Sequence, residues 1–218
     1  MAAAFGLKVF IFASKPYWVP FAKGEGYAPY WLPPRIVIDW SKDSVTELIR
    51  RDKFKAGTTR KPRLQNREFY FRAGLTYSDV SSGRLSARIL PEGWIFGHKG
   101  SAIFTEEGTS ERFLLGYLNS ALATYFMKKL INSTATASLG YIEKLPFRRP
   151  LPEIEIAVDD RVDRIVTALQ ADSSTEIQPL RDEIDDLIFD LFEIRASRDE
   201  IRRFYRTVGI VEDQAASE

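Results

Sequence analysis

The sequence predicts an α+β fold, in which a β-rich body of mixed or antiparallel strands with one long helix is followed by a C-terminal α-helical hairpin. Short runs of β-branched and aromatic residues, separated by Gly and Pro, fill the first hundred residues. Apolar residues at helical spacing appear near residue 111 and make up the whole pattern from residue 159 onward. With 218 residues, 44% of them hydrophobic, the chain can bury a sizeable core. We expect a body at residues 1–150, a helical docking segment at 151–210 and a disordered tail at 211–218.

The first part of the chain alternates short strands with loops. Residues 7–12, 35–40 and 68–72 are rich in β-formers and are expected to be strands. Residues 15–34 are dense in Pro and Gly, which favours an irregular loop. Residues 55–66 are polar and basic, so we expect a surface loop whose cations either contact phosphate or keep the surface solvated.

One helix is predicted between these strands, at residues 41–54. Val45, Leu48 and Ile49 recur at helical spacing and would form its buried face. Ser44 is a candidate N-cap, because a Glu follows three residues later.

Residues 74–104 contain a hydroxyl-rich, basic turn between two apolar runs, which predicts a pair of strands with a polar surface. Residues 91–93 (Pro-Glu-Gly) predict a turn, and residues 94–96 begin a second β-favouring run. Hydroxyl and guanidinium groups suit phosphates and base edges. They are concentrated in thirteen residues: Thr76, Tyr77, Ser78, Ser81, Ser82, Arg84, Ser86 and Arg88. The alternative is an ordinary hairpin whose polar side chains are merely solvated.

A long helix is predicted at residues 111–131, with Thr109 or Ser110 as its N-cap. Three further amphipathic stretches follow the body. Pro179 suits the first turn of the second stretch, and Ser197 with Glu200 forms a capping box for the third. These stretches predict a helical hairpin that packs on the body or on a partner protein.

The composition excludes several kinds of site. The chain has no Cys and a single His, so it offers almost no residues for disulfides, zinc sites or Cys or His nucleophiles. We therefore predict no catalytic or metal-binding residues. Residues 23–27 (KGEGY) lack the spacing of a phosphate-binding P-loop. No run approaches the length of a membrane-spanning helix, and no signal peptide is recognisable, so we expect a cytoplasmic protein without membrane contact.

Charge is unevenly distributed along the chain. Residues 1–150 contain 23 Lys or Arg and 12 Asp or Glu, whereas residues 151–218 contain 8 and 18. A basic body with an acidic C-terminal segment is typical of a module that faces nucleic acid and carries a separate protein-facing element.

Taken together, four segments resemble the C-terminal target recognition region of adenine-specific DNA methyltransferases, especially those of BREX phage-defence and fused type II restriction-modification systems. The closing helix and Lys-Leu-Pro sequence also resemble type I specificity subunits. The segments are residues 18–27 with 35–40, residues 67–104, residues 114–147 and residues 183–194.

The resemblance implies a double-stranded DNA recognition module that works with a catalytic methyltransferase domain or subunit. This sequence contains neither the glycine-rich S-adenosylmethionine loop nor the Asn/Asp-Pro-Pro-aromatic motif of that chemistry, so the cofactor is expected in the catalytic partner. Arg84 and Arg88 are candidate guanine readers, although Arg88 has a structural role as its alternative. The expected DNA-binding residues are Lys23, Tyr27, Arg60, Lys61, Arg63, Thr76, Ser78, Ser81, Ser82, Arg84, Arg88 and Lys99.

Two other functions remain open at this point. The chain is alternatively a protein-interaction or anti-restriction scaffold derived from such a domain, with the acidic helices binding a partner. A third possibility is a free-standing enzyme that uses carboxylates such as Asp39 and Asp79.

Overall fold

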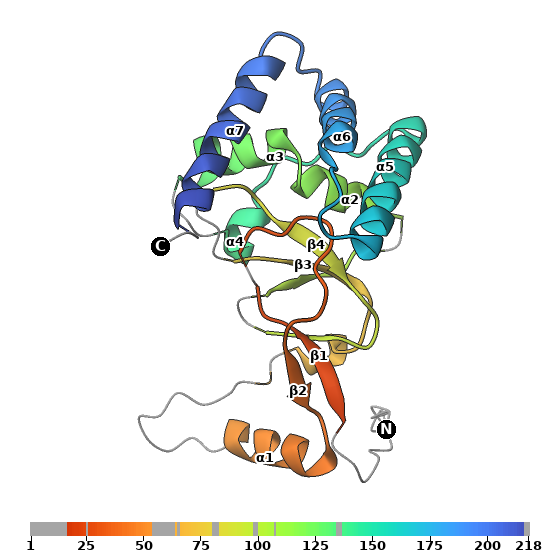
Figure 1. The fold of residues 1–218 in the computed structure, drawn as a ribbon, viewed down its shortest axis with the longest axis vertical. Helices are drawn as coiled ribbons and strands as arrows, with labels where there is room; N and C mark the ends of the chain where they lie inside the picture. The colour runs from red at the N-terminus through yellow and green to blue at the C-terminus, as the bar shows by residue number, and fades with distance from the viewer. Residues whose placement is uncertain are drawn as a thin grey trace, which may run out of the picture.

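The computed structural model describes residues 17–24, 26–53, 64, 66–79, 83–97, 100–106, 108–133 and 137–215. Its helices and two small sheets form an α+β architecture, which confirms the predicted fold class. The molecule is elongated, with most helices at one end and α1 at the other (Figure 1). The predicted strand at residues 7–12 lies outside the described residues.

The first sheet has the strand order β2-β1-β5 and joins distant parts of the chain. Strand β1 is antiparallel to β2 and parallel to β5. The bounds are β1 Trp18–Ala22, β2 Val37–Asp39 and β5 Ile95–Phe96.

The prediction of a loop throughout residues 15–34 was therefore wrong, because β1 forms despite Pro20. Phe21 N donates to Ile36 O, and Trp40 N donates to Tyr17 O, so odd-numbered residues of β1 make the hydrogen bonds to β2. The missing N–H of Pro20 would point away from β2. On that side β5 pairs only with Phe21 and Ala22, so the sheet loses no hydrogen bond.

Helix α1 (Lys42–Lys53) follows β2, and it begins two residues before the predicted N-cap. Ser44 lies in its first turn, where its hydroxyl donates to Asp39 Oδ2 at 2.5 Å. The predicted strand at residues 68–72 was also wrong. A 3-10 turn, η1 (Arg67–Phe69), occupies that position, because Tyr70 and Phe71 pack around Trp40 at centroid distances of 5.8 and 5.7 Å.

The second sheet, with the order β4-β3-β6, is antiparallel throughout. The strand pair predicted on either side of the turn at residues 91–93 was wrong, because residues 95–96 pair with β1 in the other sheet, while residues 87–90 pair with β3. The bounds are β3 Gly74–Tyr77, β4 Ala87–Leu90 and β6 Ala102–Ile103.

The predicted long helix is broken at Asn119 and Ser120. Ser110 caps α2 and Ser120 caps α3, each hydroxyl accepting a backbone N–H at 3.1 Å. The resulting segments are α2 Glu111–Leu118, α3 Ala121–Phe126, the π-helical η2 Met127–Ile131 and, after a loop, α4 Leu139–Ile142.

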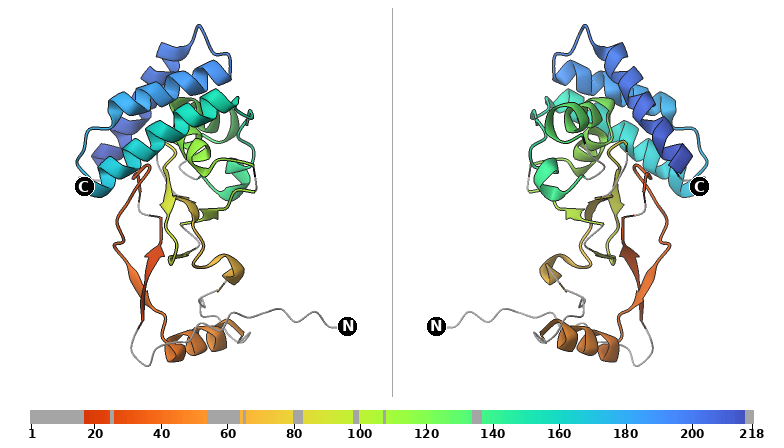
Figure 2. Two further views of the ribbon diagram at one scale, coloured as in Figure 1. Left: turned by 90° about the vertical axis from the view of Figure 1, so that its right-hand side faces the viewer. Right: turned by 90° about the vertical axis from the view of Figure 1, so that its left-hand side faces the viewer.

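Three helices complete the chain, where a hairpin was predicted. Helix α5 packs on α2 and α6, while α7 packs on α3 (Figure 2). Helix α7 continues past Gly209 into the segment predicted to be a disordered tail. The bounds are α5 Pro152–Ala171, α6 Gln178–Leu191 and α7 Arg198–Ala215. No helix within the described ranges is both long and apolar enough to cross a membrane.

The main hydrophobic core crosses residue 150, where a domain boundary was predicted. Leu75 and Leu115 of the body share it with Val162 of α5 and Ile188 of α6, and all four are completely buried. A smaller core around Val19, Trp40 and Ile95 supports the first sheet. The last three helices are thus packed on the body in one continuous core.

Candidate nucleic-acid interface

The sheet β4-β3-β6 has one apolar and one polar face. Thr76 lies directly opposite Arg88 in the β3-β4 pair, so the two side chains share a face. Ser78, two residues after Thr76, lies on the same side. Leu75 and Tyr77 point to the other face, where both join the main core.

The polar face is covered by residues 22–24 and 26–35. Ser78 Oγ donates to Gly26 O at 2.7 Å, and Arg88 Nη1 donates to Ala28 O at 3.3 Å. Tyr30 continues this cover along β4, where its N donates to Ala87 O at 2.7 Å. The Pro- and Gly-rich segment is therefore fixed to the sheet by its backbone carbonyls and amides.

A pocket remains between this cover and the sheet. Phe21, Leu32 and Trp94 contribute apolar side chains to its lining. Thr76 and Arg88 form its buried floor, with 3% and 4% of their surface exposed. The cavity volume is about 20 Å³, which is enough for one water molecule.

Lys23 and Arg35 lie at the rim of the pocket, and both are exposed. Together with Arg88 they give the lining three cationic side chains, and no described lining residue is acidic. Lys23 has no ion-pair partner among the described residues.

The floor carries an unsatisfied polar atom. Thr76 Oγ1 is completely buried and has no hydrogen-bond partner, whereas the neighbouring Ser78 Oγ accepts from Arg88 Nη2 at 2.5 Å. A buried hydroxyl without a partner costs free energy, so its retention requires an explanation.

Two other predicted contact residues are packed against α7. The Arg84 guanidinium lies 4.4 Å from the centre of the Tyr205 ring and 5.4 Å from that of Tyr27. Its Nε donates to Tyr205 O at 3.0 Å, and the two tyrosine hydroxyls are 2.7 Å apart. Arg84 and Tyr27 thus fasten α7 to the body in this conformation.

Behind this contact lie two buried ionisable side chains, Arg181 and Asp185, that were not foreseen from the sequence. Arg181 Nη1 donates to Tyr27 Oη at 2.9 Å, and the Asp185 carboxylate accepts from Ala121 N at 2.8 Å. Burial raises the pKa of Asp185 to about 6. Both residues lie within the apolar stripe of α6, so periodicity gave no signal for them.

On the helices, acids are neutralised by arginines. Arg112 Nε of α2 lies 2.7 Å from Asp163 Oδ1 of α5, and Arg161 Nε lies 3.0 Å from Glu183 Oε2 of α6. These ion pairs neutralise part of the excess negative charge of residues 151–218 within the fold.

The six predicted DNA-binding residues that the structure describes fall into three groups. Lys23 is exposed at the pocket rim, whereas Thr76, Ser78 and Arg88 are buried beneath residues 26–35 and cannot reach a duplex in this conformation. For Arg88, the hydrogen bonds match the structural alternative, with hydroxyl and carbonyl partners. Tyr27 and Arg84 contact α7. The remaining six, Arg60, Lys61, Arg63, Ser81, Ser82 and Lys99, lie outside the described residues.

The two carboxylates considered for catalysis do not come together. Hydrogen bonds, first from Ser44 and then from Ser41, lower the pKa of Asp39, which organises the start of α1. Asp79 follows β3, where its backbone O accepts from Ala137 N at 2.8 Å. Within the part of the chain that the structure describes, His, Asp and Glu residues form no metal-binding cluster.

Two longer proteins share sequence similarity with this chain, and no family model matches it. An adenine-specific methyltransferase named PglX from Lacticaseibacillus casei (strain Zhang) is 32% identical over 132 residues, which are 61% of this chain. An adenine-specific methyltransferase named BrxX from Escherichia coli O9:H4 (strain HS) is 28% identical over 131 residues, or 59% of the chain. The matches span 11% and 10% of the two relatives, so the chain corresponds to about a tenth of their length.

Proposed function

We propose that this chain is a sequence-specific double-stranded DNA recognition module of an adenine-N6 DNA methyltransferase. Its similarity to two adenine-specific methyltransferases carries the proposal. Methyl transfer and S-adenosylmethionine binding would belong to a catalytic domain or subunit outside this sequence. Flipping of the target adenine would occur in that catalytic pocket, while this module holds the flanking duplex.

The pocket rim supplies the physical basis for duplex contact. Lys23 and Arg35 are exposed cations, and no described residue that lines the pocket is acidic. Exposed cations gain affinity by releasing counterions from DNA phosphates. Phosphate contacts of this kind fix the register of a protein on DNA but carry no sequence information. The reading of bases is therefore left to side chains of the hydroxyl-rich, basic turn, such as Ser81 and Ser82, while Arg60, Lys61, Arg63 and Lys99 remain predicted phosphate contacts.

The proposal is tested by titrating a fluorescent duplex with the chain as salt rises from about 50 to about 200 mM. We expect the logarithm of the affinity to fall linearly with the logarithm of the salt concentration. Lys23→Ala should weaken binding of every duplex sequence alike and reduce the slope by about one.

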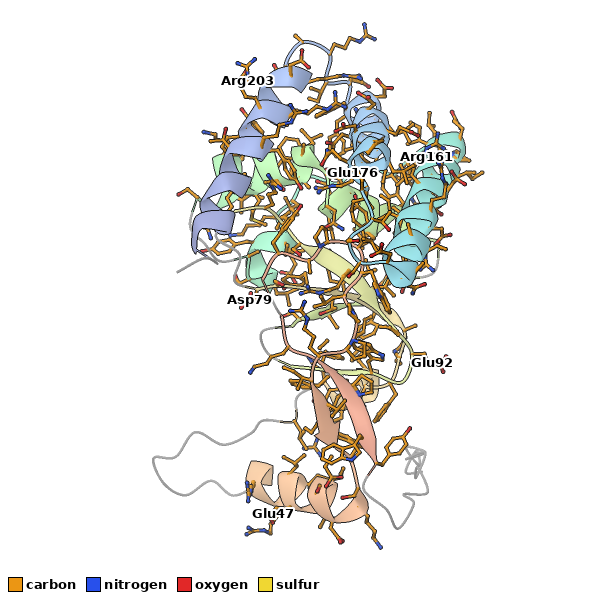
Figure 3. All side chains as sticks on the ribbon, in the orientation of Figure 1. Glu47, Asp79, Glu92, Arg161, Glu176 and Arg203 are labelled. Atoms are coloured by element: carbon orange, nitrogen blue, oxygen red, sulfur yellow. The ribbon has the colours of Figure 1, made fainter. Side chains whose placement is uncertain are left out.

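Arg203→Ala is the matched control. Arg203 is an exposed cation on α7, at the end of the molecule opposite Glu47 of α1 (Figure 3). Its removal should change neither affinity nor slope. A chain that binds no duplex even at the lowest salt concentration contradicts the proposal.

A scaffold function has one observation in its favour. Leu151 and Ile156 of the α5 region are 57% and 69% exposed, beside Phe147 at 49%. Exposed apolar groups of this kind suit a protein partner. Substituting Ile156 with Asp should abolish partner binding under that alternative and leave duplex affinity intact under the function proposed here.

A further inference from the structure

We propose that Arg72 is a base-reading residue of this module, and that its guanidinium binds the major-groove edge of a guanine. This inference rests on the proposed function and deepens it, because it assigns one base contact to a named side chain. Arg72 lies between η1 and β3, and it is exposed. In both views of Figure 2, η1 lies between the second sheet and α1, apart from the C-terminal helices.

Two phenylalanine rings hold the guanidinium in place. Its carbon Cζ lies 5.2 Å from the centre of the Phe69 ring and 5.4 Å from that of the Phe104 ring, and the rings are stacked 5.0 Å apart. The three centres therefore form a nearly equilateral triangle, with the guanidinium over the seam between the rings. Cation–π attraction to both rings restricts the long side chain before any ligand arrives.

The rings are themselves fixed by packing. Phe104 lies close to Gly74, where an added Cβ would come within 2.8 Å of Phe104 Cδ1. Phe104 also contacts Phe96 at a centroid distance of 5.9 Å, and Phe96 contacts Tyr70 at 5.4 Å. Tyr70 in turn packs against Trp40 of the smaller core. A continuous series of ring contacts thus runs from that core to the guanidinium.

The guanidinium keeps its hydrogen-bonding capacity for a ligand. With the described residues, Arg72 makes neither an ion pair nor a side-chain hydrogen bond, and its contacts are those to the two rings. The rings offer no oxygen or nitrogen acceptor, so the five N–H donors of the group are available. By contrast, Arg84 and Arg88 donate to Tyr205 O and Ser78 Oγ within the fold. Arg72 therefore combines a restricted position with donors that the described fold does not use.

The restricted fork suits the edge of a guanine. Guanine presents two acceptors, O6 and N7, side by side in the major groove, and an arginine binds both with two N–H groups. A planar fork that is already held in place loses little conformational entropy when it forms such a pair. A lysine in the same place would keep the positive charge but could not reproduce the two parallel hydrogen bonds.

The proposed base contact is linked to a predicted phosphate contact. Ala22 of β1 pairs with Phe96 of β5, and Phe96 contacts Phe104. Lys23, which follows Ala22, is exposed. The same ring contacts thus fix Arg72 relative to Lys23, so a phosphate bound by Lys23 would set the register in which Arg72 meets a base.

The test begins with selection of bound duplexes from a randomised library by the full chain and three variants. Arg72→Ala removes the guanidinium, Arg72→Lys keeps the charge without the fork, and Arg203→Ala is the control for loss of a distant cation. Sequencing of the bound duplexes gives the base preference at each position. The preferred wild-type duplex is then made with single replacements of guanine by 7-deazaguanine, which lacks the N7 acceptor. Thermal unfolding checks the folding of each variant.

We expect wild type and Arg203→Ala to require guanine at one position at which both Arg72 variants accept other bases. 7-Deazaguanine at that position should weaken wild-type binding about tenfold and leave the affinities of the Arg72 variants unchanged. Base preferences of the Arg72 variants identical to wild type overturn the inference, even if their affinity for every sequence falls, as a phosphate contact predicts. Arg72→Lys decides the matter if Arg72→Ala folds poorly, because lysine also places a cation over the rings.

The outcomes also separate this inference from the proposed function. Sequence-specific duplex binding that is the same in wild type and both Arg72 variants overturns the base contact and leaves DNA recognition standing. Duplex binding without any base preference overturns the inference and the sequence specificity of the module. Absence of duplex binding at the lowest salt concentration contradicts the proposed function, and the inference fails with it.

Discussion

Asn119, in the break between α2 and α3, is hydrogen-bonded through its side-chain amide to both backbone polar groups of Ala87 in β4. Ala87 N donates to Asn119 Oδ1, and Asn119 Nδ2 donates to Ala87 O, each at 2.9 Å. The side-chain amide thus makes the hydrogen bonds that a neighbouring strand would make to β4. Asn119 and Ala87 are both 99% buried. The predicted long helix is broken because this side chain joins the helices to the sheet.

Replacing Asn119 with Ala should lower the free energy of unfolding by about 1–3 kcal/mol, because the buried Ala87 N loses its partner, while Ala87 O keeps its hydrogen bond from Tyr30 N. Chemical denaturation followed by circular dichroism measures the change. Gln170→Ala, at an exposed position of α5, is the control and should cost less than about 0.5 kcal/mol. A similar small loss in both variants would show that the pairing contributes little.

Replacing Asp185 with Asn should remove a pH dependence of stability. Burial raises the pKa of Asp185 to about 6, so between about pH 4 and pH 6 the folded state binds more protons than the unfolded state. The free energy of unfolding contributed by this group is therefore present below that window and lost as the pH rises through it.

Asparagine keeps the acceptor for Ala121 N and carries no charge. At pH 7.5 the Asp185→Asn variant should be at least as stable as wild type, with no decline between pH 4 and pH 6 that is attributable to this position. Asp185→Ala loses the acceptor as well and should be destabilised by about 1–3 kcal/mol. If the free energy of unfolding of wild type and of Asp185→Asn changed in parallel with pH, the assignment of this pH dependence to Asp185 would be contradicted.

Arg84→Ala should weaken the attachment of α7. The guanidinium contacts the Tyr205 ring and backbone, so its loss should cost about 1–3 kcal/mol in the free energy of unfolding. Hydrogen exchange should speed up at Tyr205 and its neighbours, while the salt slope of duplex binding stays as in wild type. Unchanged exchange with a smaller salt slope would instead place Arg84 on a phosphate, as the sequence suggested.

Gly100→Ala should disturb the pocket rim. A Cβ at Gly100 would lie 2.6 Å from Ala22 O and 2.7 Å from Gly24 N, and these backbone atoms cannot yield as a flexible side chain would. We expect a stability loss of about 1–3 kcal/mol and weaker duplex binding, because residues 22–24 carry Lys23. Gly140→Ala has nothing within 4 Å of its new Cβ and lies in α4, so it should be neutral or slightly stabilising in the same thermal unfolding and binding assays. Equal stability and equal duplex binding of Gly100→Ala and Gly140→Ala would contradict the close approach of Gly100 to the backbone of Ala22 and Gly24.

The segments with strong periodicity were predictable because local pattern and tertiary burial agree in them. The apolar stripes of α5 and α6 and the cap at Ser110 all follow from residue spacing and capping chemistry. Pro20 led to the wrong prediction of a loop, because the effect of a proline on a strand depends on which edge of the strand its missing N–H would face. Only the pairing with β2 and β5 reveals that edge.

The sequence alone determined the α+β class, the helical C-terminal segment and the cationic character of the body, because periodicity, turn residues and charge are local properties. The tertiary structure decided which of the polar residues reach the surface. Thr76, Ser78 and Arg88 are buried because residues 26–35 fold back over their face of the sheet, while Lys23, just before this segment, stays exposed. Burial at these positions depends on contacts between segments some fifty residues apart, and no local pattern encodes such contacts.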